Sequence, residues 1–253
     1  MTALSELKLL TLAQLEKAAI DSGFDVVGGL ANSLMSFRSS QCPLKIWLGI
    51  VDTRPVIGLS MVNVAAELNR LSIPAPLSIE GCFAWTTAAD FVDLDYVLGR
   101  AFALARALPN QLLESWKQQV QTLSATERES LVRQRVGQDL FRDGLMALWA
   151  GCCAITGLDE PALLRASHAK PWKDASDAER LDVYNGLLLA AHLDAAFDKG
   201  LITVDQNGSV VPSPRLSQMS LQVLGLTRDK PIVQLRSQHQ LYMDWHREHV
   251  FRK

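Results

Sequence analysis

Ala166-Ser167-His168-Ala169-Lys170-Pro171-Trp172 is followed along the chain by Asn185 and then by His192, Asp194 and Asp198. The histidine ends a short apolar stretch, the asparagine comes about one loop later, and the two aspartates are four positions apart. A neutral imidazole can take a proton from water near neutral pH. Carboxylate oxygens are ligands that Mg²⁺ and Mn²⁺ prefer. The stretch therefore predicts a strand, a loop and a helix that carry a base, a residue that braces it, and oxygen ligands for one cation.

The composition is that of an ordinary globular chain. The 253 residues are 48% hydrophobic and 21% charged, which suits one large or two modest domains. No apolar run approaches the roughly 20 residues that cross a bilayer, and the first residues lack the basic region of a signal peptide. We therefore expect a cytoplasmic protein without membrane contact. The four cysteines form no C-x-x-C pair, and we expect reduced thiols.

The charge of the chain excludes a polycation. Residues 124–253 carry 16 Lys and Arg against 16 Asp and Glu, and residues 1–123 carry 9 against 11, which together give the net charge of -2. Contact with DNA must therefore come from local patches of basic side chains.

The first 123 residues have the pattern of a small α+β domain. A helix is expected at Thr11–Ser22 and another at Met61–Leu71, and strands are expected at residues 25–27, 45–51 and 56–59. The sequence of this domain contains no motif that we can interpret. Its role stays open, with target recognition as the candidate.

Helical patterns connect this domain to the second. They run from Phe91 to Leu123 with a break at Pro109. The capping box Ser124-Ala125-Thr126-Glu127 then opens a long helix that should reach Trp149. The domain boundary is placed near Ser124, which leaves residues 124–253 as the second domain.

The second domain alternates short strands with helices. A β-to-turn pattern is expected at Cys153–Gly157, and Leu163–Ser167 should be its partner strand. Asn185–Leu189 leads into a helix through Asp198, which Gly200 ends. A hairpin (201–204 with 209–211) and a last helix (238–251) complete the expected elements.

This order of strand, turn, strand ending in histidine, loop with asparagine and helix with ligands resembles the HNH nuclease family and its ββα-metal motif. Several motifs carry the resemblance: Arg135 to Arg142, Cys153 to Gly157, Ser167 to Trp172, Asn185 to Leu189, and His192 to Gly200. It covers roughly residues 132–217 and is closest to the HNH endonucleases of restriction and phage defence. It implies an α+β fold, in which helices join the small N-terminal α+β domain to an HNH nuclease domain with its core motif at 150–212.

The resemblance also implies roles for the site residues. His168 would be the general base, and Asn185 would brace the loop and help to fix the histidine ring, although Asn-Gly is also a common turn pair. Metal ligands in the family often lie nine and thirteen positions after the asparagine, which are Asp194 and Asp198 here. These two share a helix face. His192 would join them only if the helix begins later. The expected cofactor is Mg²⁺ or Mn²⁺.

Two departures from common HNH patterns stand out. Many members have an acidic metal ligand just before the base histidine, where this chain has Ser167. Many also hold a structural zinc with paired C-x-x-C motifs, whereas Cys153 is followed by Thr156 at the second position. Because a tetrahedral zinc site needs four ligands, we expect no structural zinc.

The basic residues near the motif have two interpretations. Lys170, Lys173 and Lys199 could hold phosphates. Arg135, Gln138 and Arg142 form a stripe on the long helix that lines DNA or braces the motif through ion pairs, and Arg165 points at substrate or pairs with a carboxylate.

The predicted function is metal-dependent hydrolysis of DNA phosphodiester bonds in restriction or phage defence. Two alternatives stay open: a nicking nuclease, and an HNH-fold DNA-binding or regulatory protein that has lost activity. A homodimer is one way to cut both strands, since this takes two sites or one site acting twice.

Overall fold

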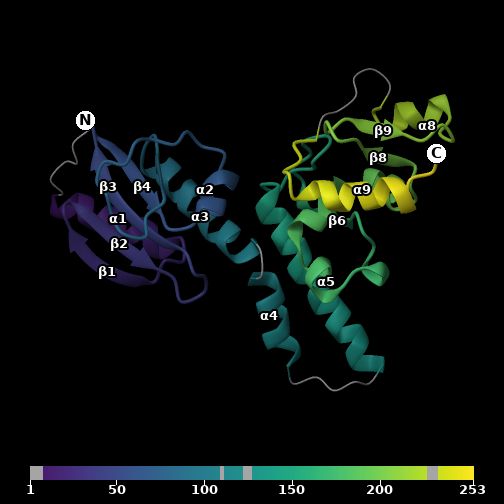
Figure 1. The fold of residues 1–253 in the computed structure, drawn as a ribbon. Coiled ribbons are helices and arrows are strands. Elements are labelled where there is room, and N and C mark those ends of the chain that lie inside the picture. Colours follow the sequence, from purple (N-terminus) through teal and green to yellow (C-terminus); the bar gives the residue numbers. More distant parts are fainter. Residues whose placement is uncertain (1–7, 109–110, 122–126, 227–232) are drawn as a thin grey trace. The chain divides into compact units, whose positions relative to one another are not determined.

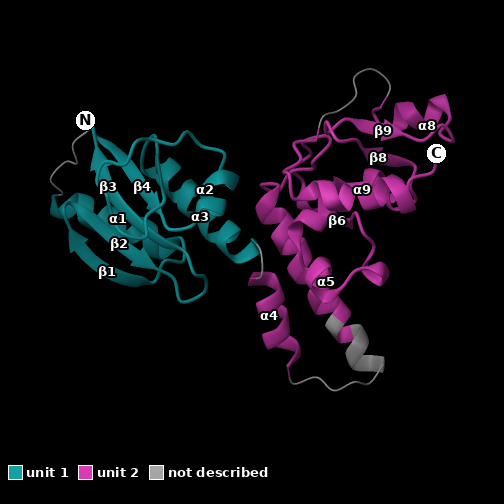
Figure 2. Ribbon diagram, in the orientation of Figure 1, with its two compact units in different colours: residues 1–108 teal, residues 109–253 magenta. Residues whose placement is uncertain are grey.

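The computed structural model describes residues 8–108, 111–121, 127–226 and 233–253. The chain divides into two compact units, an N-terminal unit of residues 1–108 and a C-terminal unit of residues 109–253 (Figure 2). The boundary expected near Ser124 and the capping box that begins there lie outside the described residues. The predicted α+β fold class is confirmed.

The N-terminal unit is an antiparallel sheet with helices (Figure 1). Its strands follow the chain order: β1 (Val26–Ala31), β2 (Leu34–Arg38), β3 (Lys45–Val51), β4 (Arg54–Leu59) and β5 (Ala84–Thr87). The helices are α1 (Leu9–Asp21), α2 (Val62–Glu67) and α3 (Phe91–Ala107). Strand β3 spans the predicted residues, and six of its seven residues are buried because both of its faces are covered.

One face of this sheet is closed by the chain segment between α2 and β5. Side chains alternate between the faces of a strand, so Trp47 of β3 lies on the same face as its opposite neighbours on β2 and β4. A core cluster forms there from Leu34, Trp47, Val51, Val56 and Trp85, with Ile73, Leu77, Ile79 and Cys82 packed against it. The expected helix at Met61–Leu71 is shorter in the structure, and the residues after it form this cover.

The C-terminal unit begins with a helical hairpin of α4 (Gln111–Val120) and α5 (Glu127–Leu148). The remaining elements are β6 (Leu164–His168), α6 (Asp177–Arg180), β7 (Gly186–Ala190), α7 (Ala191–Asp198), β8 (Ile202–Val204), β9 (Val210–Pro212), α8 (Gln218–Val223) and α9 (His239–His249). The hairpin of β8 and β9 and the last helix lie where the sequence predicts them.

The prediction of a strand that begins the segment Cys153–Gly157 is wrong. These residues form turns, with the Gly157 amide donating to the Cys153 carbonyl. The partner of β6 is β7, which pairs antiparallel with it from Leu164 opposite Ala190 to His168 opposite Gly186. All five residues of β7 are buried. Such a run lacks the alternation that identifies a strand, so its pairing depends on tertiary contacts.

The end of the chain is tied to the hairpin and to the end of α7. The Arg252 amide donates to the Gly200 carbonyl (2.9 Å), and the Ser213 hydroxyl donates to the Arg252 carbonyl. Gly200 has a φ of +66°, and a Cβ there would lie 2.0 Å from the Val250 carbonyl oxygen. Among the described residues, no helix is both long and apolar enough to cross a membrane.

Gly200→Ala should lower the unfolding free energy of the C-terminal unit by more than the cost of placing alanine in the left-handed backbone conformation. The left-handed region costs a non-glycine residue about 1–2 kcal/mol, and the clash with Val250 adds to that cost. Gly157→Ala is the matched control, because Gly157 has a φ of +73° with open space around it. Urea unfolding of both variants tests this. Equal losses of unfolding free energy in the two variants would show that the segment around Val250 moves to relieve the clash without loss of stability.

Candidate active site

His168 is the last residue of β6, and aromatic rings hold its imidazole on two sides. The ring stacks on Phe141 of α5, with centroids 3.7 Å apart and planes 12° apart. Trp172 meets it edge-on at 5.8 Å. Nε2 lies 2.9 Å from the Arg180 carbonyl oxygen. Because a carbonyl only accepts hydrogen bonds, Nε2 carries the proton of the neutral ring, and the free lone pair is on Nδ1.

Burial lowers the pKa of His168 to about 4. The Arg180 carbonyl raises this pKa and the charge of the Arg180 guanidinium lowers it, but the loss of hydration is the largest cause. The imidazole is therefore neutral at physiological pH, and Nδ1 can accept a proton.

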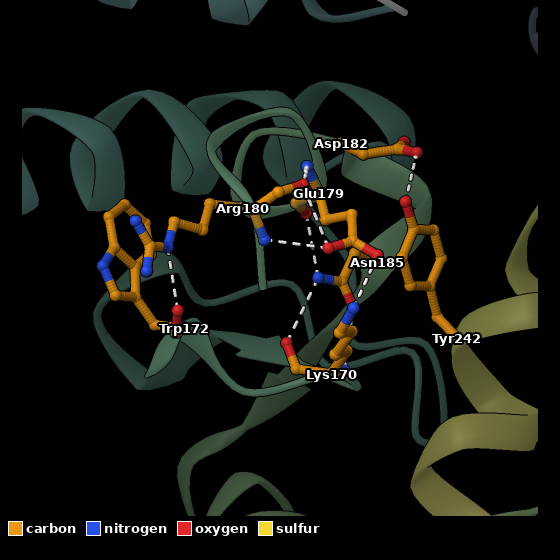
Figure 3. A network of polar contacts seen from close by, with 8 residues as sticks. Lys170, Trp172, Glu179, Arg180, Asp182, Asn185 and Tyr242 are labelled. Carbon is orange, nitrogen blue, oxygen red and sulfur yellow. Dashed lines mark hydrogen bonds and ion pairs between the residues drawn. The ribbon is translucent and has the colours of Figure 1, made fainter. Parts of the chain in front are cut away.

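Asn185 is fully buried and joins the two ends of the loop that follows β6 (Figure 3). Its Oδ1 accepts a hydrogen bond from the Lys170 amide (2.8 Å). Its Nδ2 donates to the carbonyls of Lys170 (3.2 Å) and Glu179 (2.9 Å). Arg180, whose carbonyl holds His168, is the next residue. Asn185 therefore fixes the histidine indirectly, by fixing the backbone that carries its acceptor.

Charged side chains brace the same loop. Lys170 Nζ lies 2.7 Å from Glu179 Oε1, and both side chains are partly buried. The hydrogen bond from Lys170 is the largest cause of the lowered pKa of Glu179. Arg180 donates from Nε to the Trp172 carbonyl (2.8 Å), and its guanidinium lies 5.2 Å from the Trp172 ring. Lys170 is thus engaged within the loop, and Trp172 packs in it.

Gly186, which follows the bracing asparagine, makes room for the ring that supports His168. A Cβ at Gly186 would lie 2.5 Å from Phe141 Cζ and 2.7 Å from the Ser167 carbonyl oxygen. The contact of Phe141 with His168 was not predicted, although Phe141 belongs to the motif from Arg135 to Arg142. The contribution of Arg180 was also missed, because it comes from a backbone carbonyl and leaves no side-chain signal.

Asp194 and Asp198 lie one turn apart on α7, and their environments disfavour two negative charges. Burial raises the pKa of Asp194, while the Ser167 hydroxyl and the charge of Arg165 lower it. Burial and then the charge of Asp194 raise the pKa of Asp198. The Ser167 hydroxyl is buried beside the Asp194 carboxylate. Two repelling carboxylates beside a hydroxyl oxygen are a site that a bound cation would stabilise.

His192 lies away from these carboxylates. Helix α7 begins at Ala191, so His192 is within it, and two helical positions turn a side chain by about 200° relative to Asp194. Within the described ranges, no three His, Cys, Asp or Glu side chains gather closely enough to hold a metal. Two carboxylates and a hydroxyl still fit Mg²⁺ or Mn²⁺, since Mg²⁺ usually keeps several waters and is held by one or two carboxylates plus substrate phosphates.

The basic residues divide into two groups. Arg142 donates to the carbonyls of Leu164 (2.7 Å) and Pro161 (2.8 Å), and Arg165 donates to those of Ala162 (3.0 Å) and Leu164 (2.8 Å). Both therefore brace the start of β6. Arg165 is nevertheless exposed, as are Arg135, Gln138, Lys173 and Lys199.

The sequence of this region has a known counterpart. Residues 153–205 match the family model described as HNH endonuclease. The chain contains an HNH endonuclease domain. The match includes His168, Asn185, Asp194 and Asp198, and leaves residues 1–152 and 206–253 outside it. No curated protein matches the chain. The HNH domain implies a nucleic-acid substrate and phosphodiesterase chemistry, for which the family typically uses a divalent metal.

Three buried histidines should make the C-terminal unit sensitive to acid. Burial is the main cause that lowers the pKa of His168, His239 and His246 to about 4 each. The unfolded chain, with a pKa near 6.5, then binds more protons than the folded chain. The free energy of unfolding should fall as the pH drops from about 6.5 to about 4, by about 1.4 kcal/mol per pH unit for each histidine. The raised pKa values of Asp182, Asp194 and Asp198 act in the opposite direction, closer to pH 4.

Calorimetric melting at pH 7 and pH 5 measures this effect. His246→Gln removes one titrating group and should lose less melting temperature between the two pH values than wild type does. His192→Gln, at an exposed position, should behave as wild type. A drop in His246→Gln as large as that of wild type would contradict the role of buried imidazoles.

Proposed function

We propose that this protein is a metal-dependent endonuclease that hydrolyses DNA phosphodiester bonds. One observation carries the proposal: His168 is neutral, with its Nε2 proton held by the Arg180 carbonyl and its Nδ1 lone pair free. It directly follows Ser167, whose hydroxyl acts on the Asp194 carboxylate. His168 is on β6 and the two aspartates are on α7, which packs against β6. The candidate base and the candidate cation ligands are therefore carried by neighbouring elements.

Each residue of the site has a defined part in the proposed hydrolysis. His168 Nδ1 takes a proton from the attacking water, whose oxygen forms the new bond to phosphorus while the bond to the 3′ oxygen breaks. The products have 5′-phosphate and 3′-hydroxyl ends. Asn185 keeps the Arg180 carbonyl in place. Asp194 and Asp198, with the Ser167 hydroxyl, would hold Mg²⁺ or Mn²⁺, which when bound stabilises negative charge at the phosphate and the leaving oxygen.

Four exposed basic and polar side chains are candidates for contact with DNA phosphates: Lys173, Lys199, Arg135 and Gln138. Lys170 would first have to leave Glu179. We assign Arg142 and Arg165 to bracing, because each is bonded to backbone carbonyls at the start of β6.

The wider role follows from the two-unit architecture. We propose that residues 1–123 select the target while the HNH nuclease domain within 124–253 cuts it, as a restriction or phage-defence enzyme would require. Such an enzyme acts in the cytoplasm, where thiols stay reduced, and the four cysteines are unpaired in the structure. Cutting both strands would need two copies or one site acting twice.

A second function is favoured by Ser167, which stands where many HNH proteins have an acidic ligand. In this alternative, the protein binds DNA without cutting it. A retained shift of DNA in a gel with EDTA, together with no cleavage under Mg²⁺ or Mn²⁺, would support the alternative. Nicked circles without linear product would instead indicate a nickase.

His168→Ala should lower the rate of plasmid cleavage by about 10²–10⁴-fold, because it removes the general base. Cleavage of supercoiled plasmid with Mg²⁺ or Mn²⁺ measures the rate. His192→Ala is the matched control and should retain most of the activity, since His192 is exposed and turned away from the carboxylates. Equal rates for His168→Ala and wild type would overturn the role of His168.

Asp194→Asn should weaken Mn²⁺ binding by at least about tenfold, since even partners outside the ligand shell change metal affinity by that much. Titration of free Mn²⁺ by electron paramagnetic resonance reads binding without any cleavage assay. Asp159→Asn, at an exposed position in the same unit, is the control and should bind as wild type does. Unchanged binding in Asp194→Asn would remove Asp194 from the ligand set.

A further inference from the structure

The N-terminal unit contains a cavity of about 320 Å³ on the sheet face that carries Trp47. This volume lies at the lower end of the range for pockets that hold small molecules. The walls come from strand β1 and its turn, from Leu34, Ser36 and Trp47 of the neighbouring strands, and from the covering segment Leu77–Ile79.

The edge strand opens toward this cavity through a β-bulge. Gly29 pairs with Ser36 and Val27 with Phe37, so Gly28 is the extra residue and is left out of the ladder. Gly29 has a φ of +103°, and a Cβ at Gly28 would lie 2.4 Å from the Ser36 hydroxyl oxygen. Bulges occur often beside binding sites, and glycine in a strand often marks a place where a ligand approaches the backbone closely.

The chemistry of the lining selects the class of ligand. Among the described residues, no charged side chain lines the cavity, which disfavours phosphate or carboxylate inside it. Trp47 supplies an aromatic wall, and Asn32, Ser36 and Ser78 supply polar groups beside the free backbone of the bulge. A planar, neutral ring with hydrogen-bonding edges matches this lining.

Positive charge lies next to the cavity and outside it. Lys45 Nζ is 4.7 Å from the centroid of the Trp47 ring, and Arg38 is opposite Lys45 in the sheet. Residues directly opposite each other point to the same face. Two cations therefore flank the aromatic wall, where they could neutralise the phosphates of a strand whose base enters the cavity.

We propose that this cavity binds a nucleobase turned out of the substrate DNA, and that the N-terminal unit selects its target in this way. The inference rests on the proposed nuclease function for the source of the base. Proteins that take a base out of the stack bind it between aromatic or apolar side chains and read its edge by hydrogen bonds. The ring would lie against Trp47, with its edge toward Ser36 and the bulge.

Saturation-transfer NMR of the full chain with the four 2′-deoxyribonucleosides tests the cavity directly, with 2-deoxyribose 5-phosphate as the ligand that lacks a base. Saturation should reach the base protons of at least one nucleoside, and the sugar phosphate should receive none. Ser78→Trp fills the cavity from an exposed position of the covering segment and should abolish the signal. Val92→Trp is the matched control, because Val92 is 80% exposed on α3 and does not line the cavity.

Ser36→Ala removes only a hydroxyl and should weaken nucleoside binding by about fivefold, the effect of one lost hydrogen bond. No saturation in wild type, or equal saturation in wild type and Ser78→Trp, would overturn the proposal.

Plasmid cleavage by the same proteins separates this proposal from the nuclease function. Ser78→Trp should cut more slowly than Val92→Trp by about tenfold or more, while His168→Ala should bind nucleosides as wild type does. Cleavage by wild type without nucleoside binding would refute the base pocket and leave the nuclease standing. Nucleoside binding without cleavage under any divalent ion would support the base pocket and refute the nuclease function.

Discussion

The buried amide of Asn185 is the interaction on which the geometry of the site depends. Its Oδ1 accepts a hydrogen bond from the Lys170 amide, and its Nδ2 donates to the carbonyls of Lys170 and Glu179. These bonds close the loop between β6 and β7 and fix the carbonyl of the next residue, Arg180. That carbonyl in turn selects the tautomer of His168. An unpartnered amide inside the protein would cost free energy, so the folded loop and the oriented base form together.

The second constraint is electrostatic. Asp194 and Asp198 lie one turn apart on α7. Burial and the negative charge of Asp194 raise the pKa of Asp198. The loss of hydration that keeps His168 neutral thus also acts on the two carboxylates. Helix α7 begins directly after β7, the strand paired with β6, so base and acidic residues are carried by adjacent elements. A cation would relieve the repulsion, which is why these charges suit a metal-dependent hydrolysis better than a metal-free site.

Comparison of sequence and structure shows which features are encoded locally. The order of His168, Asn185, Asp194 and Asp198 was visible because these residue types and their spacings along the chain carry the resemblance to HNH nucleases. Phe141 was visible only as a member of a motif. Its stacking on His168 requires α5 to pack against the paired strands β6 and β7. The residues of β7 were predicted only as a segment that leads into a helix, because a strand covered on both faces loses its alternation. Strands β2 and β5 were not predicted either, since each is short and is defined by its pairing within the sheet.

The sequence by itself determined the α+β class, the presence of an HNH motif, the candidate base and its bracing asparagine, and the one-turn spacing of two carboxylates. The α+β class and the one-turn spacing depend on residue type and on helical or strand periodicity, which are local properties. The HNH motif and the roles of its residues rest on the resemblance to the family. Only the tertiary structure decided that β6 pairs with β7 and that Arg142 of α5 binds backbone carbonyls at the start of β6. It alone shows the cavity beside Trp47. Each of these depends on hydrogen bonds or packing between segments distant in the chain, where spacing along the sequence contains no information about distance.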